Sequence, residues 1–313
     1  MYLLAINQTV GKIILVGGTL WLLLSSLVAA GQSPPPDSLE QRSLRQFWIV
    51  TGASYVGAQA GLYAAWYRNQ STQQFRFFDD GAQWKQVDKI GHLYSAFHLS
   101  QISAAAFQRA GVASPRSQWY GSLAGWLLLL PVEVFDGFSQ AYGFSWPDIV
   151  ANTTGSVLFL GQHALWQEVR VHPKFSFHRT TFASERPNTL GSNLAEEVLK
   201  DYNGQTYWLS VDLRSFLHRR YPQFPRWLNM AVGYGAHRML HAREAANQAA
   251  GYTAYREFFL TVDVDLHGYR KPPTTFGNRL WNGLLYAVNL IHLPAPALSY
   301  QTGRGFVFYP LYF

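Results

Sequence analysis

The spacing of hydrophobic and polar positions along this chain changes near residue 168. Before that point, apolar residues recur at helical spacing, and the segments 47–68, 85–109, 120–138 and 147–168 are each predicted to be helices. Gly111 and Pro115 end the second segment and separate it from the third. The pattern therefore predicts a bundle of about four helices over residues 47–168.

Beyond Val169 the alternation has a period of two, which is typical of strands. It is clearest in TYWLSVDL (206–213), WLNMAVGYGA (227–236), YREFFLTVDVDL (255–266) and the aromatic run 305–313. These segments predict three or four strands, and RLWNGLLYAVNLI (279–291) predicts a helix that is stopped by LPAPA. The predicted fold class is therefore α+β, with a small antiparallel sheet and one or two helices over residues 169–313.

Two features of this second half bear on its surroundings. The chain ends on alternating aromatics and Phe313, as bacterial outer-membrane barrels do. Because the smallest such barrels need eight strands, a small sheet packed on the helical domain is favoured over a barrel. Asp263 and Asp265 form a DxD sequence that resembles that of some sugar transferases, but they occupy the polar face of an alternating strand. They are interpreted as solvated strand charges.

The N-terminus has the pattern of an export signal. Lys12 precedes an apolar run over 13–30, and this run ends in the small residues Val28, Ala29 and Ala30. Residues 1–30 are predicted to be a cleaved signal peptide, with an uncleaved anchor helix as the alternative. Residues 31–46 are predicted to form a linker that PPP at 34–36 keeps extended. Export would place the protein in the cell envelope, either in the periplasm or associated with the outer membrane.

Composition narrows the classes of function. The chain has no cysteine, which excludes disulfides, thiolate metal sites, cysteine nucleophiles and attachment of a lipid to cysteine. The net charge of +7 is concentrated after residue 165, where 16 lysines and arginines oppose 10 acids. Aromatic residues lie between these cations, but no nucleic-acid-binding motif is present. A membrane surface or lipid head groups are therefore the expected partners, and nucleic acid is not.

Ionisable and polar residues inside the apolar helices of the first half fall into three groups. Each group has the spacing that places its members near one helix face. Ser145 is placed to cap the helix that Asp148 opens, with Pro147 in its first turn. Because a bare charge in apolar surroundings costs several kcal/mol, the groups are expected to converge on one polar site. They are Asp88, Lys89 and His92; Glu133 and Asp136; and Ser145, Asp148 and Asn152.

This arrangement resembles two related families. A DKxxH start, a glutamate near the end of the next apolar helix and a closing Ser-x-x-Asp-x-x-x-Asn-x-x-Gly are similar to VanZ-like proteins and, more closely, to YfiM-like predicted periplasmic lipoproteins. The blocks FRFFDDGAQWKQVDKIGH, EVFDGFS and KDYNGQTYWLS resemble longer members of the second family. The resemblance implies an envelope location and a helical core but no substrate. The chain departs from the YfiM-like pattern because it lacks the lipid-bearing cysteine.

Three interpretations of the polar residues stay open. In the first, the site binds a lipid head group or a divalent cation, for which Asp88, His92, Glu133 and Asp136 are the candidate ligands. In the second, the protein is a hydrolase of a lipid-linked or phosphorylated envelope substrate. His92 and Glu133 are then the catalytic pair, and Lys89 stabilises developing negative charge. In the third, the same residues form a structural network of buried ion pairs.

Overall fold

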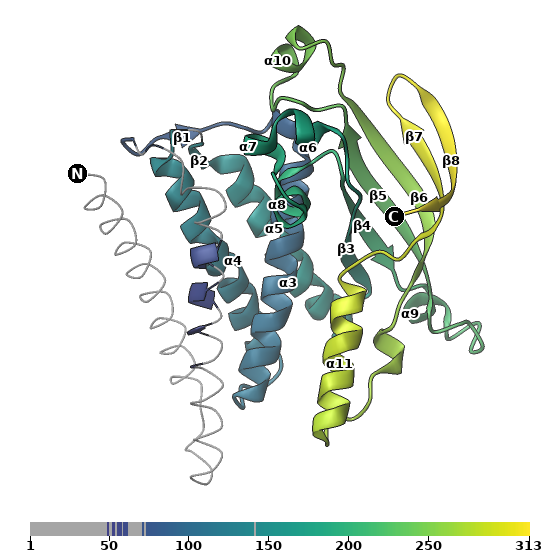
Figure 1. Ribbon diagram of the computed structural model, residues 1–313. Coiled ribbons are helices and arrows are strands. Elements are labelled where there is room, and N and C mark those ends of the chain that lie inside the picture. Colours follow the sequence, from purple (N-terminus) through teal and green to yellow (C-terminus); the bar gives the residue numbers. More distant parts are fainter. Residues whose placement is uncertain are drawn as a thin grey trace. The chain divides into compact units, whose positions relative to one another are not determined.

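The computed structural model describes residues 49, 52–53, 55–57, 59–61, 71, 73–140 and 142–313 (Figure 1). The predicted signal peptide and linker lie outside the described residues. The chain divides into two compact units, one formed by residues up to Asp80 with Ser95–Ala164, the other by Gly81–Tyr94 with Leu165–Phe313. The order of helices and strands confirms the α+β prediction.

Three long helices dominate the first unit. They are α3 (Val87–Arg109), whose first eight residues belong to the second unit, α4 (Arg116–Phe138) and α5 (Trp146–Trp166), which ends two residues beyond the unit. The described positions between 49 and 61 are also helical. A Cβ atom added to Gly121 or Gly125 would lie within 2.5 Å of the α3 backbone at Ala104 or Ser100. The small residues therefore let α3 and α4 approach closely.

The connection into α5 is fixed by local hydrogen bonds. Two short strands, β1 (Phe77–Phe78) and β2 (Phe144–Ser145), pair in parallel just before α5 begins. The hydroxyl of Ser145 accepts a hydrogen bond from the backbone N–H of Asp148 at 3.1 Å and donates to Asp80 Oδ1 at 2.6 Å. The predicted cap at Ser145 is thus confirmed, and Asp80 supports it from the β1 side.

The second unit is built on a six-stranded antiparallel sheet in sequential order. Its strands are β3 (Val171–Phe177), β4 (Gln205–Val211), β5 (Leu228–His237), β6 (Tyr255–Val264), β7 (Ala295–Gln301) and β8 (Gly305–Tyr312). The connections carry α6 (Phe182–Glu185), α7 (Pro187–Leu190), α8 (Leu194–Lys200), α9 (Leu213–Leu217), α10 (Glu244–Ala249), η2 (His267–Tyr269) and α11 (Phe276–Asn289); η1 (Gln83–Gln86) precedes α3.

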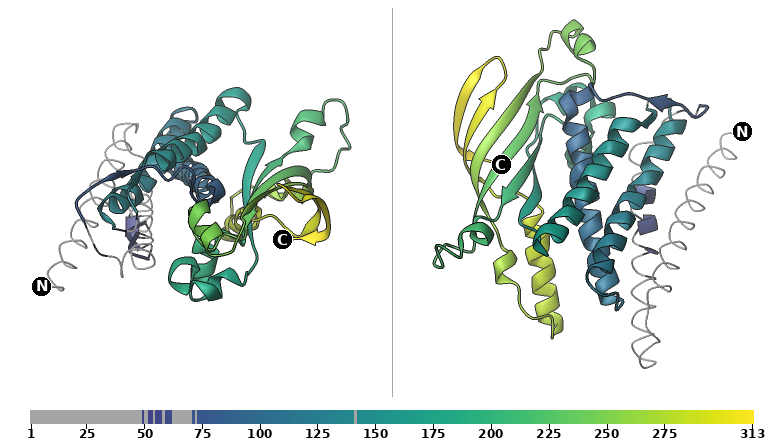
Figure 2. Two further views of the ribbon diagram at one scale, coloured as in Figure 1. Left: turned by 90° about the horizontal axis from the view of Figure 1, so that it is seen from above. Right: turned by 180° about the vertical axis from the view of Figure 1, so that it is seen from behind.

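The sheet is curled rather than flat. Figures 1 and 2 show the last hairpin, β7 and β8 in yellow, curving away from the plane of the longer strands. The hydroxyl of Tyr312 on β8 lies 2.9 Å from Thr206 Oγ1 on β4, although three strands separate them in the sheet order. The ring of Tyr312 also packs at 4.4 Å from that of Phe259. The concave face of the sheet therefore lines the interior of the second unit.

The strands β3 and β7 were not predicted from the sequence. Both carry the two-residue alternation, but each contains a proline, Pro173 or Pro296, which weakens a strand prediction. The sheet tolerates them because neither strand lies at its centre: β3 is an edge strand, and β7 is next to the edge strand β8 with an irregular register between Ala295 and Ala297. The sheet consequently has six strands rather than three or four.

Candidate functional site

The predicted residues Asp88, Lys89 and His92 lie together in the second unit. Asp88 accepts hydrogen bonds from Lys89 Nζ at 2.8 Å and from the hydroxyl of Tyr202 at 2.9 Å. His92 Nε2 lies 3.9 Å from Asp88 Oδ1. Burial opposes ionisation of Asp88, but Lys89 and His92 outweigh it and lower the pKa of the carboxyl below its ordinary value. Tyr202, which the sequence did not single out, is therefore part of this cluster.

The other predicted residues belong to the first unit. Glu133 and Asn152 are fully buried, at 0% and 1% exposed, and Asp148 is 3% exposed at the start of α5. Asp136 is half-buried near the end of α4. Because these residues and the Asp88 cluster lie in different units, the convergence of the two sets stays a prediction, as do the ion-binding and catalytic roles of His92 and Glu133.

The concave face of the sheet carries buried charge that the sequence did not predict. Lys174 Nζ on β3 lies 2.6 Å from Asp263 Oδ2 on β6, with side chains 1% and 0% exposed. The interpretation of Asp263 and Asp265 as solvated strand charges is therefore wrong. Both carboxylates belong to the polar set of the alternating segment, as predicted. This set points into the interior of the unit rather than to solvent.

A second buried carboxylate lies at the other end of this face. His237 Nε2 lies 2.7 Å from Glu257 Oε2, and Glu257 Oε1 accepts hydrogen bonds from Gln301 and Tyr309. Although burial opposes it, hydrogen bonds from His237, Ser299 and Gln301 lower the pKa of Glu257 to about 2. A carboxylate held in this way is a structural anchor for β5, β6, β7 and β8.

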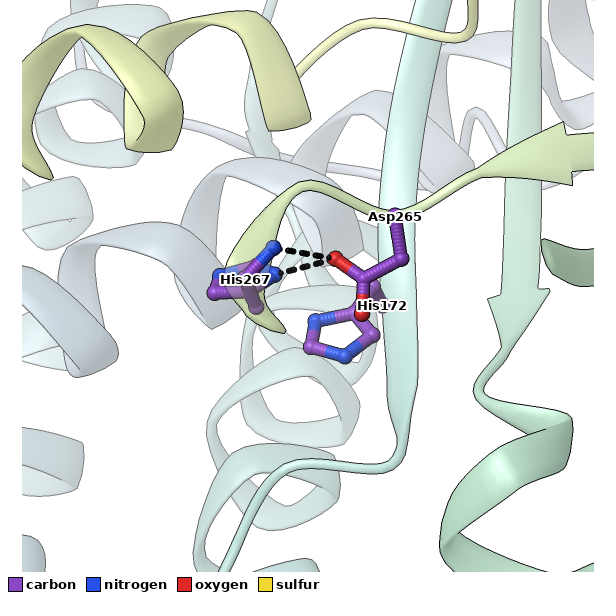
Figure 3. Close-up of side chains that lie close together, drawn as sticks. All are labelled: His172, Asp265 and His267. Carbon is purple, nitrogen blue, oxygen red and sulfur yellow. Dashed lines mark hydrogen bonds and ion pairs between the residues drawn. The ribbon is translucent and has the colours of Figure 1, made fainter. Parts of the chain in front are cut away.

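One group of side chains that could hold a metal ion consists of His172, Asp265 and His267, which could each offer one ligand atom within 4.8 Å of the others. His172 is on β3, Asp265 follows β6, and His267 begins η2. Figure 3 shows the carboxylate of Asp265 beside both imidazoles, with its interactions directed to His267. The two imidazole rings are nearly parallel, at 20°, with centroids 4.6 Å apart. Asn289 of α11 donates to the same carboxylate oxygen at 2.7 Å.

The convex face of the sheet is apolar and exposed. We call this surface the outer face. In one row of it, residues on five neighbouring strands are directly paired with one another. The side chains in this row are between 38% and 63% exposed. Further exposed apolar side chains extend the face along the strands. The row consists of Leu209, Val232, Leu260, Leu298 and Phe308, and the extension of Met230, Phe258, Val262, Tyr300 and Phe306.

Helix α11 also exposes apolar side chains while its polar side chains bond to the protein. Four of its exposed side chains form an apolar stripe at four-residue spacing, which consists of Phe276, Leu280, Leu284 and Val288. Its asparagines instead bond to the protein: Asn282 Nδ2 donates to Lys271 O at 2.7 Å, and Asn289 bonds to Leu266 N and Asp265. A helix in water normally turns its apolar stripe inward, whereas the stripe of α11 is exposed.

Cations and aromatics gather at the end of the sheet where α9 and α11 lie (Figure 1). We call residues 212–227 and 265–281 the basic end, because they contain seven lysines and arginines and two acids, neither of them exposed. Exposed aromatic rings lie among the cations. The exposed cations are Arg219, Arg220, Arg226, Arg270, Lys271 and Arg279, and the aromatics Phe216, Tyr221, Trp227, Tyr269 and Trp281.

The comparisons with known proteins identify part of the chain. Residues 76–160 match the model of a family described as predicted periplasmic lipoprotein (DUF2279). The matched segment contains α3, α4 and nearly all of α5, with every residue of the predicted polar site. The likeness to VanZ-like proteins stays a prediction. Searches of curated proteins and of solved structures gave no match.

The matched segment also contains a helix of membrane-spanning length. By length and composition alone, α4 is apolar enough to cross a bilayer, and 39% of its most apolar window is buried. Core helices of soluble proteins pass the same test, so this observation is weak by itself. The outer face and α11 belong to the part of the chain that the family match does not cover.

Proposed function

We propose that this chain is a cell-envelope protein that lies against an anionic bilayer through the outer face of its sheet and the apolar stripe of α11. The observation that carries the proposal is the inversion of the second unit: Lys174, Asp263 and Glu257 are buried, while Leu260 and Phe306 are 46% and 74% exposed. In water this arrangement is unfavourable, because burial of apolar surface stabilises a protein by about 25 cal/mol per Å² and these side chains stay exposed. Hydrocarbon around the outer face removes that cost.

The extent of the outer face suits this partner. Strands β5 and β6 each have ten residues, so the face is long as well as wide. A contiguous exposed apolar surface of this kind usually marks a protein or membrane contact. Because the exposed row runs over five neighbouring strands, the surface is continuous rather than scattered.

The basic end distinguishes a membrane from an apolar protein partner. Exposed arginines beside Trp227 and Trp281 match the interfacial region of a bilayer, where aromatic rings lie at head-group level and cations contact anionic lipids. Lys271 is also 5.6 Å from the ring centroid of Trp281, which keeps a cation at this level. The proposal thus assigns lipid head groups to the basic end and lipid chains to the outer face. The family description supports an envelope location.

Single cysteine labels test the proposal, because the chain has no natural cysteine. Leu260→Cys on the outer face and Leu280→Cys on α11 are labelled with an environment-sensitive fluorophore in the full chain and mixed with phosphatidylglycerol vesicles. Leu199→Cys on α8 is the matched control, because Leu199 and Leu260 are 45% and 46% exposed. We expect quenching by brominated lipids at positions 260 and 280 only.

Two outcomes would contradict the proposal. Equal quenching at 199 and 260 would show that contact with lipid is not specific to the outer face. A blue shift at 260 without any lipid quenching would indicate that a second copy of the chain covers the face. Arg219→Glu combined with Arg220→Glu should reduce binding to anionic vesicles and its salt dependence, since the screening length is about 10 Å at 0.1 M.

A further inference from the structure

The side chains of His172, Asp265 and His267 approach one another because β3, the end of β6 and the start of η2 meet at the same place. His172 lies on the edge strand β3, and Asp265 is held by its backbone N–H, which donates to Trp227 O at 2.8 Å. His267 follows in η2, and its backbone N–H donates to Asp265 Oδ1 at 2.8 Å. The cluster is buried: His172 is 6% exposed, Asp265 is 4% exposed, and the side chain of His267 is 21% exposed.

Hydrogen bonds fix the orientation of His267. Its Nδ1 lies 2.8 Å from Asp265 Oδ1 and also contacts Asn289 Nδ2. Nδ1 is therefore the nitrogen that faces the carboxylate, and it is the atom that His267 would offer to a metal ion bound beside Asp265. The ion would take the place of the hydrogen between the two side chains.

The carboxylates at the cluster favour a cation. Asp265 is 4% exposed, and the half-buried Asp212, at the start of α9, interacts with it. Arg270 also interacts with Asp265 and offsets part of the negative charge.

We propose that His172, Asp265 and His267 form a binding site for a divalent transition-metal ion such as Zn²⁺, with two nitrogen ligands and one carboxylate. Two imidazoles with a single carboxylate suit zinc, cobalt or nickel better than calcium or magnesium, which prefer sites made mostly of oxygen atoms. With metal–ligand distances of about 2.0–2.2 Å, ligand atoms up to 4.8 Å apart must move closer when the ion binds. The partial exposure of His267 provides a route of entry.

This site shares no residue with the polar site predicted in the helical half of the chain. It lies on β3, η2 and the segment after β6, whereas Asp88 and His92 are on α3. The inference also does not rest on contact with a membrane, since it follows from side chains inside the second unit. The two proposals can therefore fail separately.

Cobalt binding tests the site, because Co²⁺ bound by nitrogen and oxygen ligands absorbs visible light. The full chain, stripped with a chelator, is titrated with Co²⁺ and then with Zn²⁺. We expect one equivalent of Co²⁺ to bind, to be displaced by Zn²⁺, and to bind at least tenfold more weakly in His172→Gln and His267→Gln. His218→Gln is the matched control: His218 is exposed near the same end of the sheet, and its loss should leave binding unchanged.

Melting temperatures distinguish a variant that has lost metal binding from one that has misfolded. Zn²⁺ should raise the melting temperature of the His218→Gln control but not that of His172→Gln, provided that the metal-free forms of both give the circular dichroism of the native chain. Asp265→Asn, which keeps the shape of the side chain, should weaken Co²⁺ binding in the same direction. The proposal is overturned if Co²⁺ does not bind, if it binds equally in the two histidine variants, or if only His92→Gln removes binding.

Discussion

Lys174 on β3 and Asp263 on β6 form an ion pair across two intervening strands, with Nζ 2.6 Å from Oδ2 and both side chains at most 1% exposed. Lys174 also donates to Val264 O at 2.7 Å. Taking two charges out of water is costly, so a pair like this is stable only while both partners are present. It fixes the curvature of the sheet by joining strands that do not pair directly.

Removing one partner should be far more harmful than removing both. We expect Lys174→Met to lower the free energy of unfolding by about 3–5 kcal/mol, because Asp263 is left buried without its cation. Combining it with Asp263→Leu should recover most of the loss. Lys85→Met is the control, since the Lys85–Glu244 pair is partly exposed and such pairs contribute about 0–1 kcal/mol. Denaturant unfolding measures all four proteins; equal losses at Lys174 and Lys85 would contradict the prediction.

The close approach of α3 and α4 predicts opposite signs for two glycine substitutions. A Cβ at Gly121 would lie 2.5 Å from Ala104 N, so Gly121→Ala should destabilise by about 1–3 kcal/mol through overpacking. Gly161 on α5 has no atom within 4 Å of its added Cβ among the described residues. Gly161→Ala should therefore stabilise by about 0.5–1 kcal/mol through helix propensity. Thermal melting of both variants checks this, and a stabilised Gly121→Ala would show that the helices are not in contact there.

The cap of α5 makes a further prediction. Ser145→Ala removes the acceptor for the N–H of Asp148 and the donor to Asp80, and the loss of a cap costs about 1 kcal/mol. Thr154→Ala on the same helix is the comparison, because its hydroxyl donates to Val150 O within the helix at an exposed position. We expect a lower melting temperature for Ser145→Ala and almost no change for Thr154→Ala. Equal effects would mean that the cap does not contribute to stability.

The buried imidazole of His292 predicts a pH dependence. It stacks on Trp208 at 4.0 Å, and burial lowers its pKa to about 4 although Asp263 opposes the shift. The unfolded chain takes up this proton near pH 6.5 and the folded chain does so only near pH 4, so the contribution to stability is complete above pH 6.5. It is lost as the pH falls from about 6.5 to 4, at about 1.4 kcal/mol per pH unit.

His292→Phe, which keeps a ring on Trp208, should flatten this dependence. Between pH 7 and pH 4 the melting temperature of the wild type should fall by more than that of the variant. Glu257 does not obscure the comparison, because its pKa is lowered to about 2 and its contribution is lost mainly below pH 4.5. Parallel curves for the wild type and the variant would show that the pKa of His292 is the same in the folded and unfolded states.

The helices were predicted well because their signals are local. The predicted limits 120–138 and 147–168 compare with α4 at Arg116–Phe138 and α5 at Trp146–Trp166, and Ser145 caps α5 as expected. The predicted helix 279–291 compares with α11 at Phe276–Asn289. Helix spacing, caps and breakers all act within a few residues, so a single sequence contains them.

The candidate metal residues were missed for the opposite reason. A signal was present in the alternation of His172 and Lys174 with apolar neighbours, and in the spacing of Asp265 and His267. Ligands on β3 and after β6 are more than 90 residues apart in the sequence, and only the order of the strands brings them together. Asp265 was assigned to a solvated surface because nothing local indicates what covers a strand.

The sequence by itself determined the α+β class, the helix limits and which residues share a strand face. The alternation of Glu257, Thr261 and Asp263 with Phe258 and Leu260 is explicit in the printed sequence. Only the tertiary structure decided that the polar set faces inward, because a period of two separates the two faces of a strand without naming the buried one. That choice depends on the curl of the sheet and on pairs between distant strands, and it is what points to a membrane on one face and a metal ion inside.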